Sequence, residues 1–521
     1  MTDSLVSRSD LPATGAGAAR APLPPFDTLR DYVTALEGHG LLLRIPEVDQ
    51  DAFQATALVC RANDLSSFFG VPALRFDRVK IGGRWVEGPL LGLLQSNLHT
   101  DAIIFGQPLV PGNGEASYRN AKAWLSGLLE KNNGSYPRLA PVTISREKAL
   151  CKEVVLHGDE IDLTKFAFVQ TNPMDAGRYL NATSVFTSDP EMGVNVGTYR
   201  CQLKGPRLLG LNPEPNQSGW KMLMAARKRG EAVAKVSIVL GTDPVVWFIS
   251  CTRVVPRFDD KPVDELAVAG GFRGKPVDVV RSETNELLVP AHAEMIIEGE
   301  VPLQEAGLPE GPFGEMFGYL GPAKPENFFV NVTAVTHRRK PWIVNIYTGM
   351  QRGMVTSPQD ALTDYFLRRA VPNLVESYMF QDNMGVFIVS IDKTGPGQGL
   401  KAGRAVADRN PIAKVVIVVY KDIDVMDRTQ ILFALGSRWQ PAAATELLKD
   451  MWGLSTDPSQ AKQGRTSKIV IDATRQWPAE GGRENFPATN RELLETGAPG
   501  VIAEVDRLFG TALKTWMAAQ K

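Results

Sequence analysis

Short strand-like runs fill the chain from about Val142 to Gly349, and this feature restricts the possible folds more than any other. The runs are rich in β-branched and aromatic residues, and Gly, Pro, Asn and Asp separate them. One amphipathic helix is expected among them, near Trp220–Lys228. Many short strands with turn residues between them favour a barrel or a sandwich. The expected strands are Lys152–Leu156, Ala182–Thr187, Thr198–Leu203, Val236–Leu240, Val245–Ser250, Ala293–Val301, Phe328–His337 and Trp342–Thr348.

The segment before this β region mixes helical and strand patterns. A helix is expected over Asp27–Gly38 with Asp27 as its N-cap, and a strand over Leu41–Ile45 follows it. These patterns predict a small α/β domain over residues 26–140. Residues 1–25 are rich in Ala, Ser, Gly and Pro and lack the apolar core of a secretion signal, so they are predicted to form a disordered tail.

A long helix and a second α/β domain are expected after the β region. Ser357 and the proline and acid behind it predict a helix start. The helix is expected to reach Tyr378 and to kink at Pro372, which makes residues 351–380 a linker helix and a candidate hinge.

Strand-like runs then alternate with helical patterns, and this rhythm predicts an α/β domain over residues 381–500. Residues 501–521 are expected to form a terminal helix. Its apolar stripe packs either on its own domain or on another subunit, so a homodimer or a larger homo-oligomer is expected.

The composition excludes several classes of protein. The chain has 57 basic and 58 acidic residues without a block of one charge, which argues against partners such as nucleic acid or an anionic membrane. Its four cysteines form no C-x-x-C pair and it has five histidines, which argues against a zinc site and fits a reducing cytoplasm. No apolar run approaches the roughly 20 residues that a membrane-spanning helix needs. We therefore expect a cytoplasmic protein.

The stretch Glu310-Gly-Pro-Phe-Gly-Glu315 is the strongest candidate for catalysis. Two carboxylates flank a Gly-Pro-Phe-Gly turn, and such a turn holds two acids near each other. Paired carboxylates in different environments serve as acid and base at neutral pH. The alternative is a surface turn with two solvated glutamates. A two-carboxylate glycosidase is a weaker alternative, because the flanking residues lack the aromatic platforms that a sugar needs.

Two further segments carry polar residues of interest. The first runs from Asp175 through Tyr179 to Asn195 and Arg200, where an amide oxygen and a permanently charged fork suit carboxylates or phosphates. The second begins at Glu265, an acid at the start of a small, apolar, helix-like run. A glycine-rich loop at Gly395–Gly403 departs from the spacing of a dinucleotide-binding loop, and a mobile loop is the preferred interpretation.

Together these motifs resemble the UbiD family of reversible decarboxylases, which includes ferulic acid decarboxylase. The resemblance is carried by Glu-Gly-Pro-Phe-Gly-Glu-Met-x-Gly-Tyr at Glu310–Tyr319, by Val-Pro-Ala-x-Ala-Glu before it, and by the Glu265 segment. Ala413–Val425 and the Ala-Leu-Gly-Ser-Arg sequence ending at Arg438 resemble the C-terminal strand and helix of the family. The motifs occur in the family's order over roughly residues 27 to 475.

The resemblance implies a multidomain α+β and α/β protein whose residues 141–350 form a flavin-reductase-like split β-barrel that binds prenylated FMN. The flavin drains electrons from the breaking C–C bond of an aromatic, heteroaromatic or α,β-unsaturated acid, or of a relative such as an aryl thioester acid. Glu315 is then the general acid, and Arg200 pairs with Glu310 and orients the substrate carboxylate. A flavin prenyltransferase would supply the cofactor.

The resemblance also implies a divalent metal, Mn²⁺ or Mg²⁺, and a monovalent cation, K⁺ or Na⁺, at the flavin phosphate. The family's metal-binding histidine has no counterpart between Asn212 and Trp220, so Gln217, Ser218 or a water takes its place. A flavin-binding relative that has lost turnover is therefore the alternative function. The implied metal ligands are Asn195, Glu265 and Ser218, and the implied cofactor contacts are Asn195, Gly197, Thr198, Arg200, Gln217 and Glu265.

Overall fold

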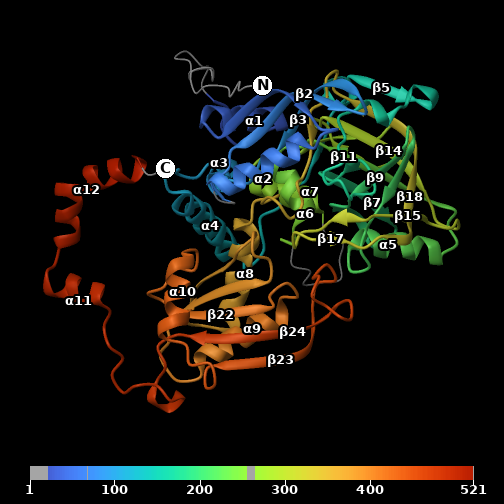
Figure 1. The fold of residues 1–521 in the computed structure, drawn as a ribbon. Helices are drawn as coiled ribbons and strands as arrows, with labels where there is room; N and C mark the ends of the chain where they lie inside the picture. The colour runs from blue at the N-terminus through green and yellow to red at the C-terminus, as the bar shows by residue number, and fades with distance from the viewer. Residues whose placement is uncertain (1–20, 67–68, 255–263, 520–521) are drawn as a thin grey trace.

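The computed structural model describes residues 21–66, 69–254 and 264–519 (Figure 1). Most of the predicted disordered tail, residues 1–20, lies outside the described residues. Of the helices in the described ranges, none is both long and apolar enough to cross a membrane.

The N-terminal region pairs a small sheet with helices. The sheet has the strand order β1-β2-β3-β19, so a short strand from the end of the central region completes it. Thr28 caps α1 in a capping box with Asp31, and Asp27 pairs instead with Arg273 and Lys275. The predicted Asp27 cap is therefore wrong by one residue. The elements are α1 (Leu29–Gly38), β1 (Leu42–Asp49), α2 (Gln54–Ser66), β2 (Ala73–Ile81), β3 (Arg84–Gly92), α3 (His99–Phe105), α4 (Gly114–Lys131) and β19 (Ile343–Val344).

A ten-stranded sheet dominates the central region, in agreement with the strand-rich pattern of the sequence. Its order is β6-β9-β10-β18-β14-β11-β7-β8, and β5 and β15 pair with β18 outside this path. Val185, Ile238, Ile297 and Val335 are fully buried on its inner face. The strands are β5 (Val154–His157), β6 (Tyr179–Leu180), β7 (Thr183–Asp189), β8 (Gly193–Gly197), β9 (Cys201–Gly205), β10 (Leu208–Leu211), β11 (Val233–Leu240), β14 (Met295–Pro302), β15 (Leu308–Glu310) and β18 (Lys324–His337).

Helices and short strands surround this sheet (Figure 1). The predicted strand Val245–Ser250 is wrong, because this run lies within helix α6 (Pro244–Cys251). Asp243 caps α6 and Pro244 stands in its first turn, and both favour a helix start. The other elements are β4 (Val142–Thr143), α5 (Ser218–Lys228), α7 (Glu265–Arg273), β12 (Asp278–Arg281), β13 (Leu288–Pro290), β16 (Phe313–Gly314) and β17 (Leu320–Gly321).

The C-terminal region is a five-stranded α/β sheet with the order β20-β21-β22-β24-β23. Strands β21, β22 and β24 are parallel, and β20 and β23 run antiparallel at the two edges. The elements are α8 (Ser357–Ala370), β20 (Leu374–Met379), β21 (Val386–Ile391), α9 (Gln398–Arg409), β22 (Val415–Tyr420), α10 (Arg428–Ser437), β23 (Thr445–Trp452), β24 (Arg465–Ala473), α11 (Asn490–Gly497) and α12 (Val501–Ala519).

The prediction of one kinked linker helix over residues 351–380 is wrong. Helix α8 begins at Ser357 as expected but ends at Ala370, and Leu374–Met379 is strand β20 of the C-terminal sheet. Pro372 disfavours helical backbone at the residue before it, and the chain turns there instead of kinking. The C-terminal sheet therefore begins before residue 381. Because α8 has no kink at Pro372, the kink no longer supports a hinge at this position.

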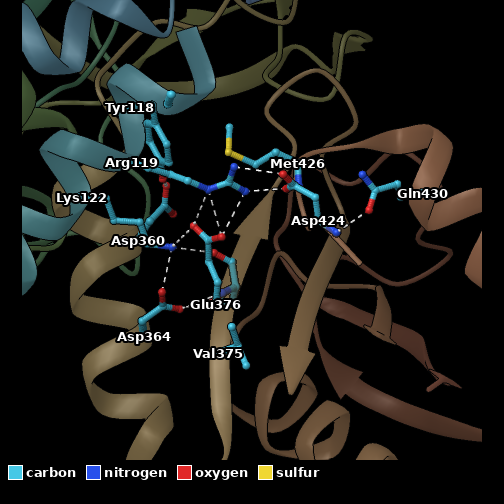
Figure 2. Close-up of polar contacts among 12 residues, drawn as sticks. Tyr118, Arg119, Lys122, Asp360, Asp364, Val375, Glu376, Asp424, Met426 and Gln430 are labelled. Carbon is cyan, nitrogen blue, oxygen red and sulfur yellow. Dashed lines mark hydrogen bonds and ion pairs between the residues drawn. The ribbon is translucent and has the colours of Figure 1, made fainter. Parts of the chain in front are cut away.

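A network of ion pairs joins α4 to the C-terminal region (Figure 2). Arg119 contacts Asp424 at 2.5 Å and Glu376 at 3.2 Å, and Lys122 contacts Asp364 at 2.8 Å and Glu376 at 3.3 Å. Lys122 is buried. Since these groups come from α4, α8, β20 and the loop after β22, the network fixes the N-terminal region against the C-terminal sheet.

Candidate active site

The loop Glu310–Glu315, called the carboxylate loop below, is held by two short strand pairs. Glu310 ends β15, which pairs with β18, and β16 pairs with β17 on the other side of the turn. Gly311 has φ +75°, a conformation that side chains other than glycine's rarely adopt. The turn therefore directs the chain from Glu310 to Glu315 without a helix or a long strand between them.

Arg200 bridges the two glutamates. It lies in the break between β8 and β9, and its Nε and Nη2 donate to the two carboxylate oxygens of Glu310 at 2.8 Å each. Its Nη1 donates to Glu315 Oε1 at 2.5 Å. The structure thus brings together the three residues that the sequence singled out, although Arg200 is 110 positions from Glu310.

The two carboxylates differ in exposure. The side chain of Glu310 is 1% exposed and that of Glu315 is 18% exposed. Burial opposes the charge of Arg200, but the hydrogen bonds and negative charges of Glu310 and Glu315 outweigh it and raise the pKa of Arg200. A permanently charged guanidinium therefore joins one buried carboxylate to one that is accessible to a ligand.

Three residues to which the sequence pattern assigns no role support this arrangement. The Phe313 ring lies 4.7 Å from the guanidinium carbon of Arg200. The Tyr179 hydroxyl donates to Glu310 at 3.3 Å, and its ring packs on Phe313. Asp175 accepts the Gly314 N–H at 2.9 Å and so fixes the turn. The Asp175–Tyr179 segment stood out in the sequence, but only the folded chain reveals its partners.

One predicted metal ligand, Asn195, and the residue after another contact the hydroxyl group of Tyr199. Asn195 Nδ2 lies 3.1 Å from it, and the backbone N–H of Gly219, the residue after Ser218, donates to it at 3.0 Å. Burial, ahead of the nearby negative charge of Glu265, raises the pKa of Tyr199. Asn195, Ser218 and Glu265 lie in β8, α5 and α7 respectively.

This donor set consists of an amide, a hydroxyl and a carboxylate oxygen, which suits a hard divalent cation. In the described part of the chain, no group of three or more His, Cys, Asp or Glu side chains is placed to hold a metal. Ser218 and Glu265 also begin helices α5 and α7, and helix N-termini favour phosphate groups. The residues present therefore fit a metal and a phosphate together.

The remaining predicted cofactor contacts have the following positions. Gly197 ends β8 beside the Tyr199 ring, and Thr198 binds Ser250 through its backbone N–H and its hydroxyl, both at 2.9 Å. Gln217 uses its side-chain oxygen to accept the N–H of Glu214 at 2.7 Å. That oxygen is therefore engaged within its own turn.

Comparisons with known proteins agree with this geometry. Residues 142–351 match the 3-octaprenyl-4-hydroxybenzoate carboxy-lyase Rift-related domain, and residues 354–473 match the C-terminal domain of the same enzymes. The chain belongs to the UbiD family. An uncharacterized member from Synechocystis is 30% identical over 88% of this chain and 91% of its own length. As a member of the UbiD family, the protein is a carboxy-lyase.

Several UbiD relatives have names or solved structures. The phenolic acid decarboxylase of Escherichia coli O157:H7 is 28% identical over 91% of this chain and 97% of its own length. The UbiD-class enzyme HmfF from Pelotomaculum thermopropionicum, solved with FMN, is 28% identical with a TM-score of 0.73 over 89% of this chain and 97% of that chain. Vanillic acid decarboxylase from Sedimentibacter hydroxybenzoicus, in its closed form, is 26% identical with a TM-score of 0.73 over 92% and 99%. The UbiD fold therefore extends over nearly the whole chain.

Proposed function

We propose that the protein catalyses the reversible, non-oxidative decarboxylation of an aromatic or heteroaromatic acid, or of an aryl thioester acid, with prenylated FMN. The observation that carries the proposal is the bridge from Arg200 to both Glu310 and Glu315. UbiD family membership and the decarboxylase names of the relatives support aromatic acid decarboxylation.

Each residue of the bridge has a separate role in this proposal. Glu310, which is buried, fixes two of the guanidinium nitrogens of Arg200 and thereby its direction. Arg200 binds the substrate carboxylate, since a guanidinium pairs with carboxylates in two parallel hydrogen bonds. Glu315, the more exposed acid, delivers a proton to the carbon that loses CO₂. In the carboxylation direction the same carboxylate removes that proton.

The cofactor would lie against the ten-stranded sheet, which we interpret as the split barrel of the family. Asn195, Ser218 and Glu265 would hold Mn²⁺ or Mg²⁺ next to the flavin phosphate, with K⁺ or Na⁺ beside it. When bound, prenylated FMN supplies the electron sink for the breaking C–C bond. HmfF has been solved with FMN and, in an evolved dimeric form, with prFMN, which supports a flavin here.

The replacement Glu315→Gln tests the assignment. It keeps the shape of the side chain but removes the ionisable proton, so exchange of isotopically labelled CO₂ with the carboxyl group of the substrate acid should fall by a factor of about 10² to 10⁴. Both enzymes would be made alongside a flavin prenyltransferase, which we propose as the supplier of the cofactor, and their absorbance spectra should match. Glu305→Gln, at an exposed glutamate before the loop, is the matched control.

Full exchange by the Glu315→Gln enzyme would refute the role of Glu315. If the flavin-loaded wild type released no CO₂ from any aromatic acid, the protein would be a flavin-binding relative without turnover. The absence of a histidine between Asn212 and Trp220, where the family has a metal-binding histidine, is the feature that supports this second function.

A further inference from the structure

Residues 170–179, called the bracing segment below, connect the N-terminal region to the carboxylate loop. At the start of this segment, Gln50 Nε2 donates to the backbone oxygen of Gln170 at 2.9 Å. The Thr56 hydroxyl donates to the backbone oxygen of Thr171 at 2.7 Å, across 115 positions of sequence. Gln50 and Thr56 are buried, and Thr56 lies in α2. Side chains of the N-terminal region therefore fix one end of the bracing segment.

The middle of the bracing segment holds the turn of the carboxylate loop. One carboxylate oxygen of Asp175, which is buried, accepts the Gly314 N–H at 2.9 Å. The next residue, Ala176, donates its backbone N–H to the backbone oxygen of Pro312 at 2.9 Å. Because Gly314 immediately precedes Glu315, Asp175 fixes the backbone from which the Glu315 side chain extends.

The end of the bracing segment reaches Glu310 through Tyr179. The Tyr179 hydroxyl donates to Glu310 Oε1, the same oxygen that accepts Arg200 Nε. Burial, and after it the negative charge of Glu310, raises the pKa of Tyr179, so the hydroxyl keeps its proton. The Tyr179 ring packs on Phe313, which in turn faces the guanidinium of Arg200. Tyr179 thus contacts both the carboxylate that directs Arg200 and the ring that covers it.

We propose that the bracing segment positions the proton-transfer residues, with Asp175 acting on Glu315 and Tyr179 acting on Glu310 and Arg200. This inference rests on the function proposed above, in which Glu315 transfers the proton and Arg200 binds the substrate carboxylate. Reacting groups must be held within about 0.5 Å of the productive geometry, and the residues around them supply this precision. The two positioning residues therefore act on different kinetic constants.

Tyr179→Phe tests the end of the bracing segment, because it removes the hydroxyl and keeps the ring. Glu310 then loses one hydrogen bond and directs Arg200 less firmly, so the substrate carboxylate binds more weakly. KM for the acid that the wild type decarboxylates should rise about tenfold, while kcat stays within about twofold. Tyr420→Phe, at the end of β22 in the C-terminal sheet, is the matched control and should leave both constants unchanged.

Asp175→Asn tests the middle of the bracing segment. The two carboxylate oxygens of Asp175 accept two backbone N–H groups, those of Gly314 and Asn172, and the NH₂ of an amide cannot accept either. The turn should shift and move Glu315, so kcat should fall about 10- to 100-fold while KM stays within about threefold. Asp427→Asn is the matched control, since Asp427 also accepts two backbone N–H groups, at the start of α10.

Hydrogen exchange of the full-length, flavin-free protein tests the bracing segment without turnover. Backbone amides of the carboxylate loop should exchange at least about tenfold faster in Asp175→Asn than in the wild type. Thr56→Val keeps the side-chain volume and removes only the hydroxyl at the far end of the segment, and it should also speed this exchange. Asp427→Asn should not. Circular dichroism shows that each variant is folded, and Thr56→Val serves if Asp175→Asn is not.

The two measurements separate failure of the bracing segment from failure of the proposed function. A wild type without CO₂ release, together with faster loop exchange in the variants, removes the proposed function and retains the segment as the support of the loop. The inference is overturned by unchanged loop exchange in both Asp175→Asn and Thr56→Val. It is also overturned if Tyr179→Phe and Asp175→Asn have the same kcat and KM as their controls, Tyr420→Phe and Asp427→Asn.

Discussion

Replacement of Arg200 by lysine keeps the positive charge but removes the fork that joins the two glutamates. Arg200 donates two hydrogen bonds of 2.8 Å to Glu310 and one of 2.5 Å to Glu315. A lysine ammonium is a compact charge on a flexible chain, and it lacks the planar fork. We expect it to stay with the buried Glu310 and to lose its contact with Glu315.

The size of the effect follows from the contact that is lost. A hydrogen bond to a charged group contributes about 1.5–3 kcal/mol. If Arg200 holds Glu315 and the substrate carboxylate in place only for the transition state, each 1.36 kcal/mol lowers the rate tenfold, and kcat/KM should fall roughly 10- to 150-fold.

The assay compares Arg200→Lys with Arg207→Lys after loading with prenylated FMN. Arg207 precedes β10 in the same sheet, and its side chain is 50% exposed, so its replacement should leave kcat/KM unchanged. Equal flavin absorbance in the two enzymes shows that any decrease in kcat/KM does not result from a lower cofactor content. An Arg200→Lys enzyme with wild-type kcat/KM would refute the argument, because the bridge would then have no catalytic effect.

Three further changes test other parts of the structure. Gly197→Ala places a Cβ 2.2 Å from the hydroxyl of Tyr199, so we expect at least a tenfold loss of Mn²⁺ affinity by calorimetry, while an unchanged affinity would place the metal elsewhere. Burial raises the pKa of Asp360 to about 6, so its contribution to stability is present below about pH 4 and lost as the pH rises through 6. Asp360→Asn should therefore gain about 2–3 kcal/mol on the wild type between pH 4 and pH 7, read from urea midpoints, and a constant difference would contradict this. Lys122→Met leaves the buried carboxylate of Asp364 without its cation and should destabilise the protein by about 3–5 kcal/mol, whereas Arg61→Met at an exposed pair should change stability by less than about 0.5 kcal/mol.

Most strands and helices were predictable from local pattern. The strand-rich character of residues 142–349 and the helix start at Ser357 depend on nearby residues alone, and the structure has both. The predicted strand Val245–Ser250 was wrong because its first five residues are all apolar. Such a short run shows neither the strand repeat nor the helix repeat, so its pattern does not distinguish a helix from a strand. The two residues before that run, Asp243 and Pro244, indicate a helix, because an N-cap followed by a proline in the first turn is typical of a helix start.

The end of α8 shows a different limit. The pattern after Ser357 was read through Pro372 as one kinked helix, although the residue before a proline favours extended backbone. The strand that follows, β20, gains its hydrogen bonds from β21. The stability of a strand at the edge of a sheet depends on hydrogen bonds to its neighbouring strand, and its own sequence does not show which strand that is.

The site residues occupy the positions where regular structure stops. Glu310 ends a strand, Arg200 lies in the break between β8 and β9, and Glu315 follows a two-residue strand. Periodicity cannot place such residues, because side chains in a break follow neither the strand nor the helix repeat. The Glu310–Glu315 motif can place them, because Gly311, at φ +75°, and the two acids of this motif constrain one another's positions. The hydrogen bond from Tyr179 to Glu310 could not be predicted from the sequence. It joins residues 131 positions apart, and no local pattern around either residue indicates the other as its partner.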